Sequence, residues 1–361
     1  MSSRPQEVLA SPFGPALFAA RIKAAPEDFL VEEIAAEDAS GSGEHRLLWI
    51  EKRGFTTSEV AQRLCRWAKV APVAIGFAGM KDKQAVTRQR FTVHLPKRVA
   101  PDTAALEEEG LRVLSQDWHA RKLPRGGLAG NAFTITLREL SGADGAAPDA
   151  ALKAAIDARL AAIAAHGVPN RFGVQRFGRF GDNVGQARRM FAGAKVGRET
   201  RSMLLSAARS ELFNRVLEAR VAAGSWAQAI DGEVFMLDGR KSVFGPEPLT
   251  PELAARIATF DLHPTGPLWG RGALRTRGAA QAIEAAIAAD EPALCKGLEE
   301  AGLAQERRAL RVRAEALAWD WREDDALELR FRLPPGSYAT AVLACLCGET
   351  GEGGEGLPDG D

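Results

Sequence analysis

Short runs of β-branched and aromatic residues recur in the first part of the chain. Residues 28–32 and 46–50 are two such runs, separated by a polar, Gly-containing stretch, and both predict strands. Apolar and polar residues alternate with period two over residues 91–95 and 131–140, which predicts two half-buried strands. The same alternation returns over residues 327–333, so we expect a further strand near the C-terminal end.

Helical spacing dominates the region between these strands. Thr56 and Glu59 stand three apart and form a potential capping box for a helix with one apolar stripe. A second helical pattern opens at Pro148 and ends at Gly167, and from residue 170 to about 302 the chain is mostly helical in pattern and Ala-rich. Strands followed by helices and then a strand indicate a helical insertion in a sheet domain that closes with its C-terminal strand.

The composition is that of an ordinary globular protein without net charge. The 361 residues include 47 Lys and Arg against 47 Asp and Glu, and 46% are hydrophobic. Bulk positive charge therefore does not bind a polyanion, and any such site must be local. Five acidic residues lie in a Gly-rich tail at 348–361, which we expect to be disordered, so the rest of the chain has 47 basic residues against 42 acidic ones.

Signals for metals, nucleotide cofactors and membranes are missing from the sequence. The four cysteines form no CxxC pair and the five histidines neighbour no motif, so we expect no metal site and no disulfide framework. No Gly-rich run fits a Walker or dinucleotide fingerprint. No apolar run of about 18 residues and no basic segment leading into an apolar one occurs, so we expect a cytoplasmic protein that neither enters a membrane nor is secreted.

The most unusual stretch places one carboxylate among cations. Asp82 lies between Lys81 and Lys83, and two arginines follow within eight residues. Nearby positive charges favour the ionised form of a carboxylate, which makes Asp82 a poor general acid and a competent nucleophile. The cations suit phosphates. A solvated turn in which Asp82 neutralises its neighbours is the alternative that spacing alone leaves open.

A second unusual segment, residues 170–183, interleaves arginines with phenylalanines. Arg171, Arg176 and Arg179 alternate with three phenylalanines at Gly-punctuated intervals. Guanidinium groups suit phosphates and aromatic rings suit unpaired bases, so this composition is typical of a surface that binds folded or single-stranded RNA. The alternative is a Gly-rich loop held in the core by its phenylalanines, with solvated arginines.

One predicted strand carries a polar and an aromatic side chain on the same face. Asn131 and Phe133 lie two residues apart, so both side chains leave the strand on one side. An amide beside a stackable ring suits a nucleotide pocket, and a strand-entry Asn with a core Phe is the alternative. Phe331 shares its face with three leucines, so a core position is its first interpretation. Tyr338 is the single tyrosine, and a base-stacking platform must therefore use Phe or Trp.

Taken together, these elements resemble the TruD family of tRNA pseudouridine synthases. The resemblance is ordered, runs from about Lys23 to Leu343, and rests on Lys23 with residues 28–32, 79–82 (Gly-Met-Lys-Asp), 130–133 (Gly-Asn-Ala-Phe), 169–178 and 333–340. The Lys-Asp element with its Thr-Arg-Gln sequel is the most specific of them and favours a functional Asp82 over the solvated turn. Pro335 and Tyr338 stand where the family more often has Ala and Phe, which are conservative changes.

The resemblance implies an α+β fold. We expect a pseudouridine synthase domain with a mixed, mainly antiparallel sheet flanked by helices, into which an α/β TRUD domain is inserted. On this basis we place the discontinuous catalytic domain at 1–156 and 306–347, the inserted domain at 157–305, and the disordered acidic tail at 348–361.

The resemblance also implies an isomerase that converts a uridine of tRNA to pseudouridine, position 13 being the usual target. The N1 glycosidic bond breaks and the ribose C1′ joins C5 of the same uracil, after the nucleotide has been flipped out of its stack. The implied reaction uses no cofactor and no metal. The expected partner is tRNA, with no obligate protein partner and a monomeric protein.

The family's functional residues carry over to matching positions of this chain. Asp82 is the implied catalytic carboxylate, paired with Lys23, and attack at C1′ or at C6 stays open. The implied and expected substrate contacts are Asn131 and the stacking Phe133 in the pocket, Phe29 and Phe331 lining it, Glu32 at a neighbouring loop, and Lys81, Arg171 and Arg176.

Two other function classes compete with this interpretation. A non-catalytic RNA-binding protein is disfavoured by Asp82 itself, because a carboxylate facing phosphates weakens binding. A metal-dependent nuclease or deaminase would need clustered His, Cys or acidic ligands that the sequence does not offer.

Overall fold

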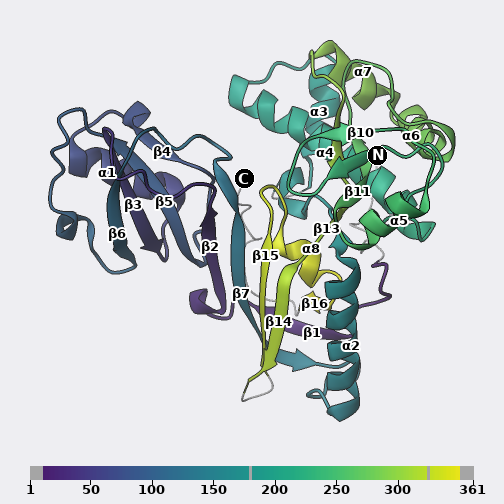
Figure 1. Ribbon diagram of the computed structural model, residues 1–361, viewed down its shortest axis with the longest axis horizontal. Helices are drawn as coiled ribbons and strands as arrows, with labels where there is room; N and C mark the ends of the chain where they lie inside the picture. Colours follow the sequence, from purple (N-terminus) through teal and green to yellow (C-terminus); the bar gives the residue numbers. More distant parts are fainter. Residues whose placement is uncertain (1–10, 179–180, 323–325, 350–361) are drawn as a thin grey trace. The chain divides into compact units, whose positions relative to one another are not determined.

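The structure is a computed structural model that describes residues 11–178, 181–322 and 326–349 (Figure 1). Its residues pack into two compact units, each built from separate pieces of the chain. The sheet unit holds residues 18–153, 315–336 and 348–349, and the helical unit holds residues 11–17, 154–314 and 337–347. The chain therefore leaves the sheet unit, builds most of the helical unit, and returns to complete the sheet.

These units begin and end at other residues than the domains expected from the sequence. Residues 337–347, expected in the catalytic domain, pack in the helical unit. There Ser337 Oγ donates to Asn170 Oδ1 (3.3 Å) and Arg176 Nη2 donates to Tyr338 Oη (2.7 Å). Contacts between segments so distant in the chain leave no periodic signal in the sequence. The tail expected to be disordered lies outside the described residues from position 350 onward.

The sheet unit is built on one large mixed sheet. Its strands are β1 (Phe18–Ile22), β2 (Phe29–Ala35), β3 (His45–Lys52), β4 (Ile75–Phe77), β5 (Val86–His94), β6 (Leu111–His119), β7 (Leu128–Ser141), β14 (Glu315–Trp321) and β15 (Leu327–Leu333). They run in the order β14-β15-β7-β2-β5-β3-β6, with β1 also paired to β7 and β4 to β5. The pair β2 and β5 is parallel and the other pairs in this order are antiparallel. The predicted α+β class with a mainly antiparallel sheet is confirmed.

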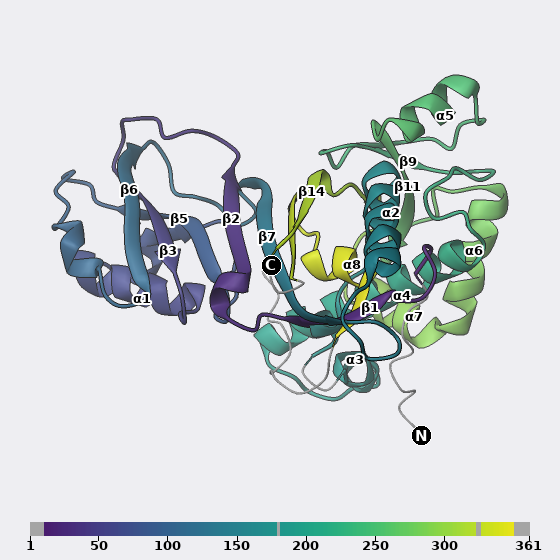
Figure 2. The same cartoon turned by 90° about the horizontal axis from the view of Figure 1, so that it is seen from below.

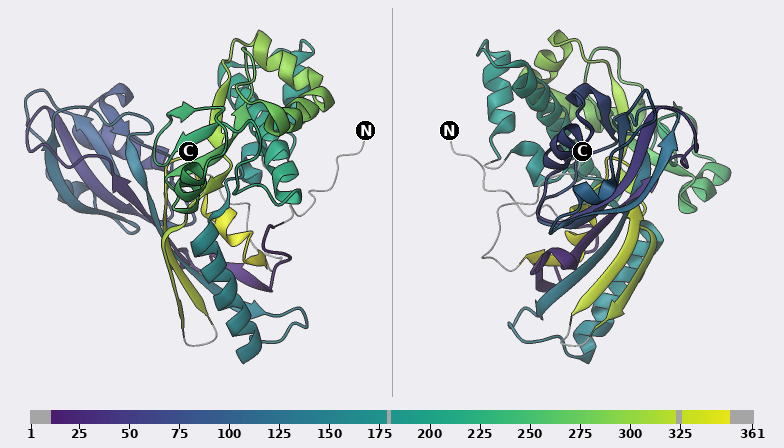
Figure 3. Two further views of the ribbon diagram at one scale, coloured as in Figure 1. Left: turned by 45° about the vertical axis from the view of Figure 1, so that its right-hand side comes forward. Right: turned by 90° about the vertical axis from the view of Figure 1, so that its left-hand side faces the viewer.

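The five predicted strands are β2 and β3, expected from runs of β-branched and aromatic residues, and β5, β7 and β15, expected from alternation. Alternation is clearest where one face of a strand is buried, as in β15, where leucines and Phe331 are buried between more exposed charged residues. The terminal strands of the path, β6 and β14, are largely exposed, and the residues of β14 alternate only between exposed and half-buried. In both views of Figure 3, β14, β15 and β7 run side by side.

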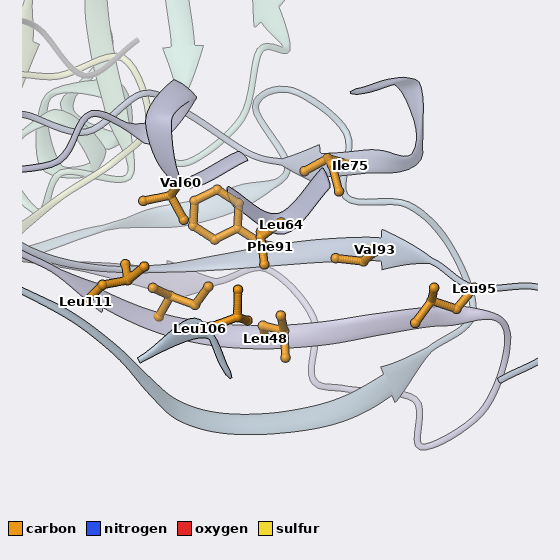
Figure 4. Packing of buried hydrophobic residues seen from close by; sticks show 10 residues of the cluster. Leu48, Val60, Leu64, Ile75, Phe91, Val93, Leu95, Leu106 and Leu111 are labelled. Carbon is orange, nitrogen blue, oxygen red and sulfur yellow. The ribbon is translucent and has the colours of Figure 1, made fainter. Parts of the chain in front are cut away.

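Helix α1 (Thr57–Ala68) covers one face of β3 and β5 (Figure 2). The predicted capping box is confirmed: Glu59 N–H donates to Thr56 Oγ1 (3.1 Å), and Thr56 N–H donates to Glu59 Oε2 (2.6 Å). The apolar stripe of α1 is buried at Val60 and Leu64, which pack with Phe91 and other buried side chains of the sheet (Figure 4). This core holds β3, β4 and β5 against α1, and so supports the loop between β4 and β5.

The helical unit contains most helices and two small sheets. Its helices are α2 (Ala150–His166, which starts in the sheet unit), α3 (Asn183–Phe191), α4 (Arg198–Ala222), α5 (Pro251–Ala258), α6 (Gly278–Asp290), α7 (Pro292–Glu300) and α8 (Ala339–Leu343). Its strands are β8 (Val168–Pro169), β9 (Phe235–Leu237), β10 (Val243–Phe244), β11 (Leu262–Leu268), β12 (Glu306–Ala309) and β13 (Arg311–Val312), and β16 (Cys347–Glu349) ends the described chain. Short 3-10 helices are η1 (Pro26–Asp28), η2 (Pro72–Ala74), η3 (Thr103–Leu106) and η4 (Val174–Phe177).

The region predicted to be mostly helical also contains a four-stranded sheet, β10-β9-β11-β12. Its central strand β11 has the sequence Leu-His-Pro-Thr-Gly-Pro-Leu, whose prolines and glycine follow neither a helical nor a strand period. The helices α3, α4 and α7 share a separate apolar core, which includes Leu204, Leu212 and Leu298. The predicted helix after Pro148 is α2, and the chain turns at Gly167 with φ 73°, where a Cβ would lie 2.5 Å from the Val312 oxygen. No helix in the described part of the chain is long and apolar enough to cross a membrane.

Candidate active site

The candidate catalytic loop, residues 78–85, joins β4 to β5 in the sheet unit. Asp82 lies in this loop and is 8% exposed. Lys23 Nζ donates to Asp82 Oδ2, and the backbone N–H of Gln84 donates to Asp82 Oδ1 (2.9 Å). Both side chains of the ion pair are less than a tenth exposed. The structure thus brings together the carboxylate and the ammonium that the resemblance pairs.

Lys23 follows strand β1 in an uncommon backbone conformation. Its φ is 58°, in the left-handed region that residues with a Cβ seldom adopt. Its Nζ also lies 4.5 Å from the centre of the Phe29 ring, a cation–π distance. The ammonium therefore contacts both the carboxylate and an aromatic ring of β2.

Three phenylalanines from adjacent strands meet on one face of the sheet. Phe133 in β7 and Phe331 in β15 are direct cross-strand partners, and their rings stack with centroids 5.3 Å apart. Phe29 in β2 meets the Phe133 ring edge-on at 6.3 Å. All three rings are buried. Phe331 is thus both a core residue, as its pattern indicates, and part of the aromatic cluster that the resemblance implies.

Asn131 lies on the same strand face as Phe133, opposite Leu333 in β15. Its Oδ1 is buried and accepts no hydrogen bond from the described residues. Gly130, before it, lets the two strands approach, since a Cβ there would lie 2.5 Å from the Leu333 oxygen. A buried acceptor without a partner is uncommon and calls for an explanation such as a bound ligand or water.

Lys81 points away from the surface. Its Nζ lies 3.9 Å from a carboxylate oxygen of Glu33, and Arg90 approaches the other oxygen at 3.5 Å. Burial raises the pKa of Glu33, which the charges of Lys81 and Arg90 oppose, and burial lowers the pKa of Lys81. Because its side chain is 4% exposed, Lys81 is not at the surface where it was expected to bind substrate.

Glu32 lies on the opposite face of β2 from Phe29 and Glu33, because side chains alternate along a strand. It pairs with Arg88 (3.0 Å), which also bonds Glu51 (2.9 Å). This arrangement ties β2, β5 and β3 together. The structure thus places Glu32 away from the aromatic face, in a surface ion-pair network rather than beside the loop it was expected to hold.

Arg171 and Arg176 lie in the helical unit. Arg176 donates to Ser206 Oγ (3.1 Å) as well as to Tyr338, and burial lowers the pKa of Arg171. Phe172 packs edge-on against Phe213 with ring centroids 5.5 Å apart, as the core-loop alternative expects. Arg179 and Phe180 of the same segment lie outside the described residues.

Three fully buried polar side chains, none of them among the site residues expected from the sequence, hold the catalytic loop. Thr57 Oγ1 accepts from the Lys81 backbone N–H (2.8 Å), and Gln89 Nε2 donates to the Gly79 carbonyl (3.1 Å). Lys52 is the third. Lys52 could have been found from the sequence, because it continues the apolar face of Leu48 and Ile50 on a predicted strand. A lysine at such a position is unusual.

A cavity of about 680 Å³ lies beside this loop, between α1, β4 and residues 122–125. Lys122 and Arg125 line it, and the Arg125 guanidinium stacks 3.8 Å from the centre of the Phe77 ring. None of its lining residues is acidic. The Gly126 N–H donates to the Ala78 carbonyl (2.7 Å), which joins this basic segment to the catalytic loop.

The described residues contain no group of three or more His, Cys, Asp or Glu side chains placed to hold a metal ion. The arrangement that remains is a single carboxylate with an ammonium partner, an aromatic wall and an unpaired amide oxygen. Such a set suits nucleophilic attack on a flat, hydrogen-bonding ligand.

Comparison with known proteins identifies similar chains. The family model "tRNA pseudouridine synthase D (TruD)" matches residues 16–187 and 187–345. A tRNA pseudouridine synthase D of Xanthomonas campestris pv. campestris (strain B100) is 52% identical over 358 residues, which cover 95% of each chain. The protein of the same name from Pseudomonas syringae pv. tomato is 46% identical over 334 residues, which cover 92% of each chain.

A solved structure from Methanosarcina mazei, described as the putative tRNA pseudouridine synthase D (TruD), has a similar fold. It superposes with a TM-score of 0.71 and covers 94% of this chain and 96% of its own, at 20% sequence identity. At that identity the likeness concerns the fold.

Proposed function

This chain belongs to the TruD family of tRNA pseudouridine synthases, and on that premise we propose that Asp82 is the carboxylate with which it isomerises a uridine of tRNA, at position 13, without a cofactor. The observation that carries the proposal is the buried Lys23–Asp82 ion pair beside three phenylalanine rings. A monomeric state and a cytoplasmic location stay predictions.

The chemistry assigns a role to each member of the pair. The N1–C1′ bond of the uridine breaks and a C5–C1′ bond forms, while the hydrogen at C5 leaves as a proton and N1 gains one. Asp82 supplies the nucleophilic oxygen, at C1′ or at C6 of the ring. The Lys23 ammonium stabilises the negative charge of that oxygen and orients it.

The pocket residues receive the base. A uridine stacked in folded tRNA must leave its stack before it reacts, at a cost of roughly a few kcal/mol. The ring of Phe133, backed by Phe29 and Phe331, offers the stacking surface that replaces the lost neighbours. Asn131 Oδ1 is the acceptor for the N3–H of uracil, which accounts for a buried oxygen that has no partner in the described protein.

Residues 122–125, which precede the Gly126–Ala78 hydrogen bond to the catalytic loop, form a basic segment. They provide a local site for a polyanion, which a chain without net charge needs. Lys122 and Arg125 contact phosphates of the tRNA next to the reacting nucleotide, in a cavity whose lining carries no opposing carboxylate. Arg171 and Arg176 are proposed as further contacts from the helical unit. Lys81 and Glu32 act as supports of the sheet and the loop.

The substitution Asp82→Asn tests the assignment. It removes the nucleophile and keeps the shape, so we expect loss of tritium release from tRNA labelled at C5 of uracil, with the tRNA affinity unchanged within about threefold. Asp144→Asn, an exposed carboxylate of the same unit, is the control and keeps full activity. Release at the wild-type rate from Asp82→Asn would refute the assignment, and loss of both binding and release would point to misfolding, which circular dichroism detects.

A further inference from the structure

Lys52 is a lysine without exposure to solvent. It is the last residue of β3, and its side chain is 0% exposed. Its Nζ donates to the carbonyl oxygens of Phe55 (2.7 Å), Asp82 (2.8 Å) and Lys81 (3.3 Å). No carboxylate of the described residues forms a salt bridge with it, so backbone oxygens are its partners.

The three acceptors define the protonation state that fits the site. An ammonium has three N–H donors and no acceptor, whereas a neutral amine has two donors and one lone pair. A neutral Lys52 would leave one carbonyl oxygen facing a lone pair. The observed arrangement therefore requires the ammonium form.

Two of these carbonyl groups flank one residue. The Lys81 carbonyl belongs to the peptide group before Asp82, and the Asp82 carbonyl to the peptide group after it. Holding both oxygens fixes the two peptide planes between which the Asp82 side chain leaves the backbone. The direction of the carboxylate toward Lys23 is fixed in this way.

We propose that the Lys52 ammonium is a positioning residue for catalysis, which aims the Asp82 carboxylate and whose deprotonation releases the catalytic loop. The inference rests on the proposed function of Asp82. It adds a residue that never touches the substrate and a dependence of the reaction on pH. Thr57 and Gln89 hold the same loop by neutral hydrogen bonds and serve as comparison.

Burial brings the pKa of the Lys52 ammonium close to neutral pH. The pKa of Lys52 is lowered to about 7, chiefly by burial and also by the charge of Lys81, while the charges of Asp82 and Glu59 oppose the change. The ammonium is therefore present below about pH 7 and is lost above it. The phosphates of a bound tRNA raise the pKa, so kcat should fall at a higher pH than kcat/KM, which reports the free enzyme.

The free energy of unfolding changes with pH in the opposite direction to the activity. An unfolded lysine keeps its proton to about pH 10.4, so between about pH 7 and that value the unfolded chain binds more protons than the folded one. This group then makes the folded state more stable as pH rises, while the reaction slows. A fall in activity at alkaline pH is therefore separable from unfolding.

The test compares Lys52→Met with Thr57→Val from pH 5.5 to 9. At pH 6.5 we expect Lys52→Met to lower kcat about 10- to 100-fold with KM changed less than about threefold, and to lose the alkaline fall of kcat. Thr57→Val removes a loop hydrogen bond without removing a charge, so it lowers kcat and keeps the wild-type pH dependence. Urea unfolding of each variant at both ends of the range reports its stability.

Four outcomes decide between the assignments. A wild-type kcat without an alkaline fall, or a Lys52→Met variant that keeps the fall at the same pH, overturns the role of Lys52. If Lys52→Met does not fold, Lys52→Gln, which keeps two donors without charge, takes its place. An inactive Asp82→Asn with a fully active Lys52→Met refutes this inference alone, whereas an active Asp82→Asn refutes the proposed function.

Discussion

The buried ion pair of Asp82 and Lys23 costs free energy, and a role in catalysis explains this cost better than a contribution to folding stability does. Transfer of each charge from water into a buried site costs several kcal/mol, which a single ion pair does not always repay. Lys23 adds a left-handed backbone conformation that costs about 1 kcal/mol for a residue with a Cβ. Costs concentrated on neighbouring residues are typical of functional sites, where the surrounding structure maintains them.

Asn131→Ala separates function from stability at one residue. Since Oδ1 has no partner in the described protein, its removal should leave the free energy of unfolding unchanged or raise it. Loss of the proposed bond to uracil should lower kcat/KM by about 10- to 100-fold, which corresponds to about 1–3 kcal/mol. Tritium release and urea unfolding measure the two effects.

The control for this prediction is Asn214→Ala in helix α4. The Asn214 amide accepts from the Phe172 N–H and donates to the Phe172 carbonyl, each at 3.0 Å. Its loss should lower the free energy of unfolding by about 2 kcal/mol. If Asn131→Ala destabilises the protein as much as this control does, Asn131 is a structural residue.

At the scale of elements, the site is made by connections between strands. The catalytic loop joins β4 to β5, and residues 120–127 join β6 to β7. Both connections meet at the Gly126–Ala78 hydrogen bond, and strands hold their ends in place. Loops that carry function on a rigid sheet are a common arrangement, because the sheet supplies precision and the loops supply exposed groups.

Arg125→Ala tests the connection between β6 and β7 as a tRNA contact. If Arg125 neutralises one phosphate, its loss weakens tRNA binding and reduces the slope of log K against log salt by about one. Arg112→Ala is the control, because Arg112 is an exposed arginine of β6 in a second cavity, whose lining includes Glu27 and Glu51. Equal slopes for Arg125→Ala, Arg112→Ala and the wild type would contradict the contact.

At the scale of the molecule, the chain divides its residues between two units. The proposed chemistry lies in the sheet unit, built mainly from two segments that flank most of the helical unit in the sequence. The arginine-rich segment lies in the helical unit. The matches to the relatives cover more than nine tenths of this chain and of each relative, so the similarity extends over both units.

The target nucleotide is a property of the whole enzyme and its tRNA. We expect pseudouridine at position 13 in tRNA from cells that express the wild-type protein, and unmodified uridine there in cells that lack it or carry Asp82→Asn. Chemical mapping of total tRNA measures this. Pseudouridine that depends on the protein at another position would refute the site while leaving the family and the role of Asp82 intact.

The sequence alone determined what local patterns encode. Runs of β-branched and aromatic residues identified β2 and β3. Alternation identified β5, β7 and β15, because a strand with one buried face repeats apolar residues every second position. Spacing also indicated the α1 capping box and the shared face of Asn131 and Phe133. The family motifs pointed to Asp82. Each of these patterns extends over only a few consecutive residues.

Only the tertiary structure decided which distant residues meet. The register of β15 on β7 places Phe331 against Phe133, and the path from β1 to the catalytic loop brings Lys23 to Asp82. The inward direction of Lys81 and the burial of Lys52 beneath the loop also depend on packing around them. Such contacts join segments tens to hundreds of residues apart, and their partners are set by the burial of the whole sheet rather than by any local period.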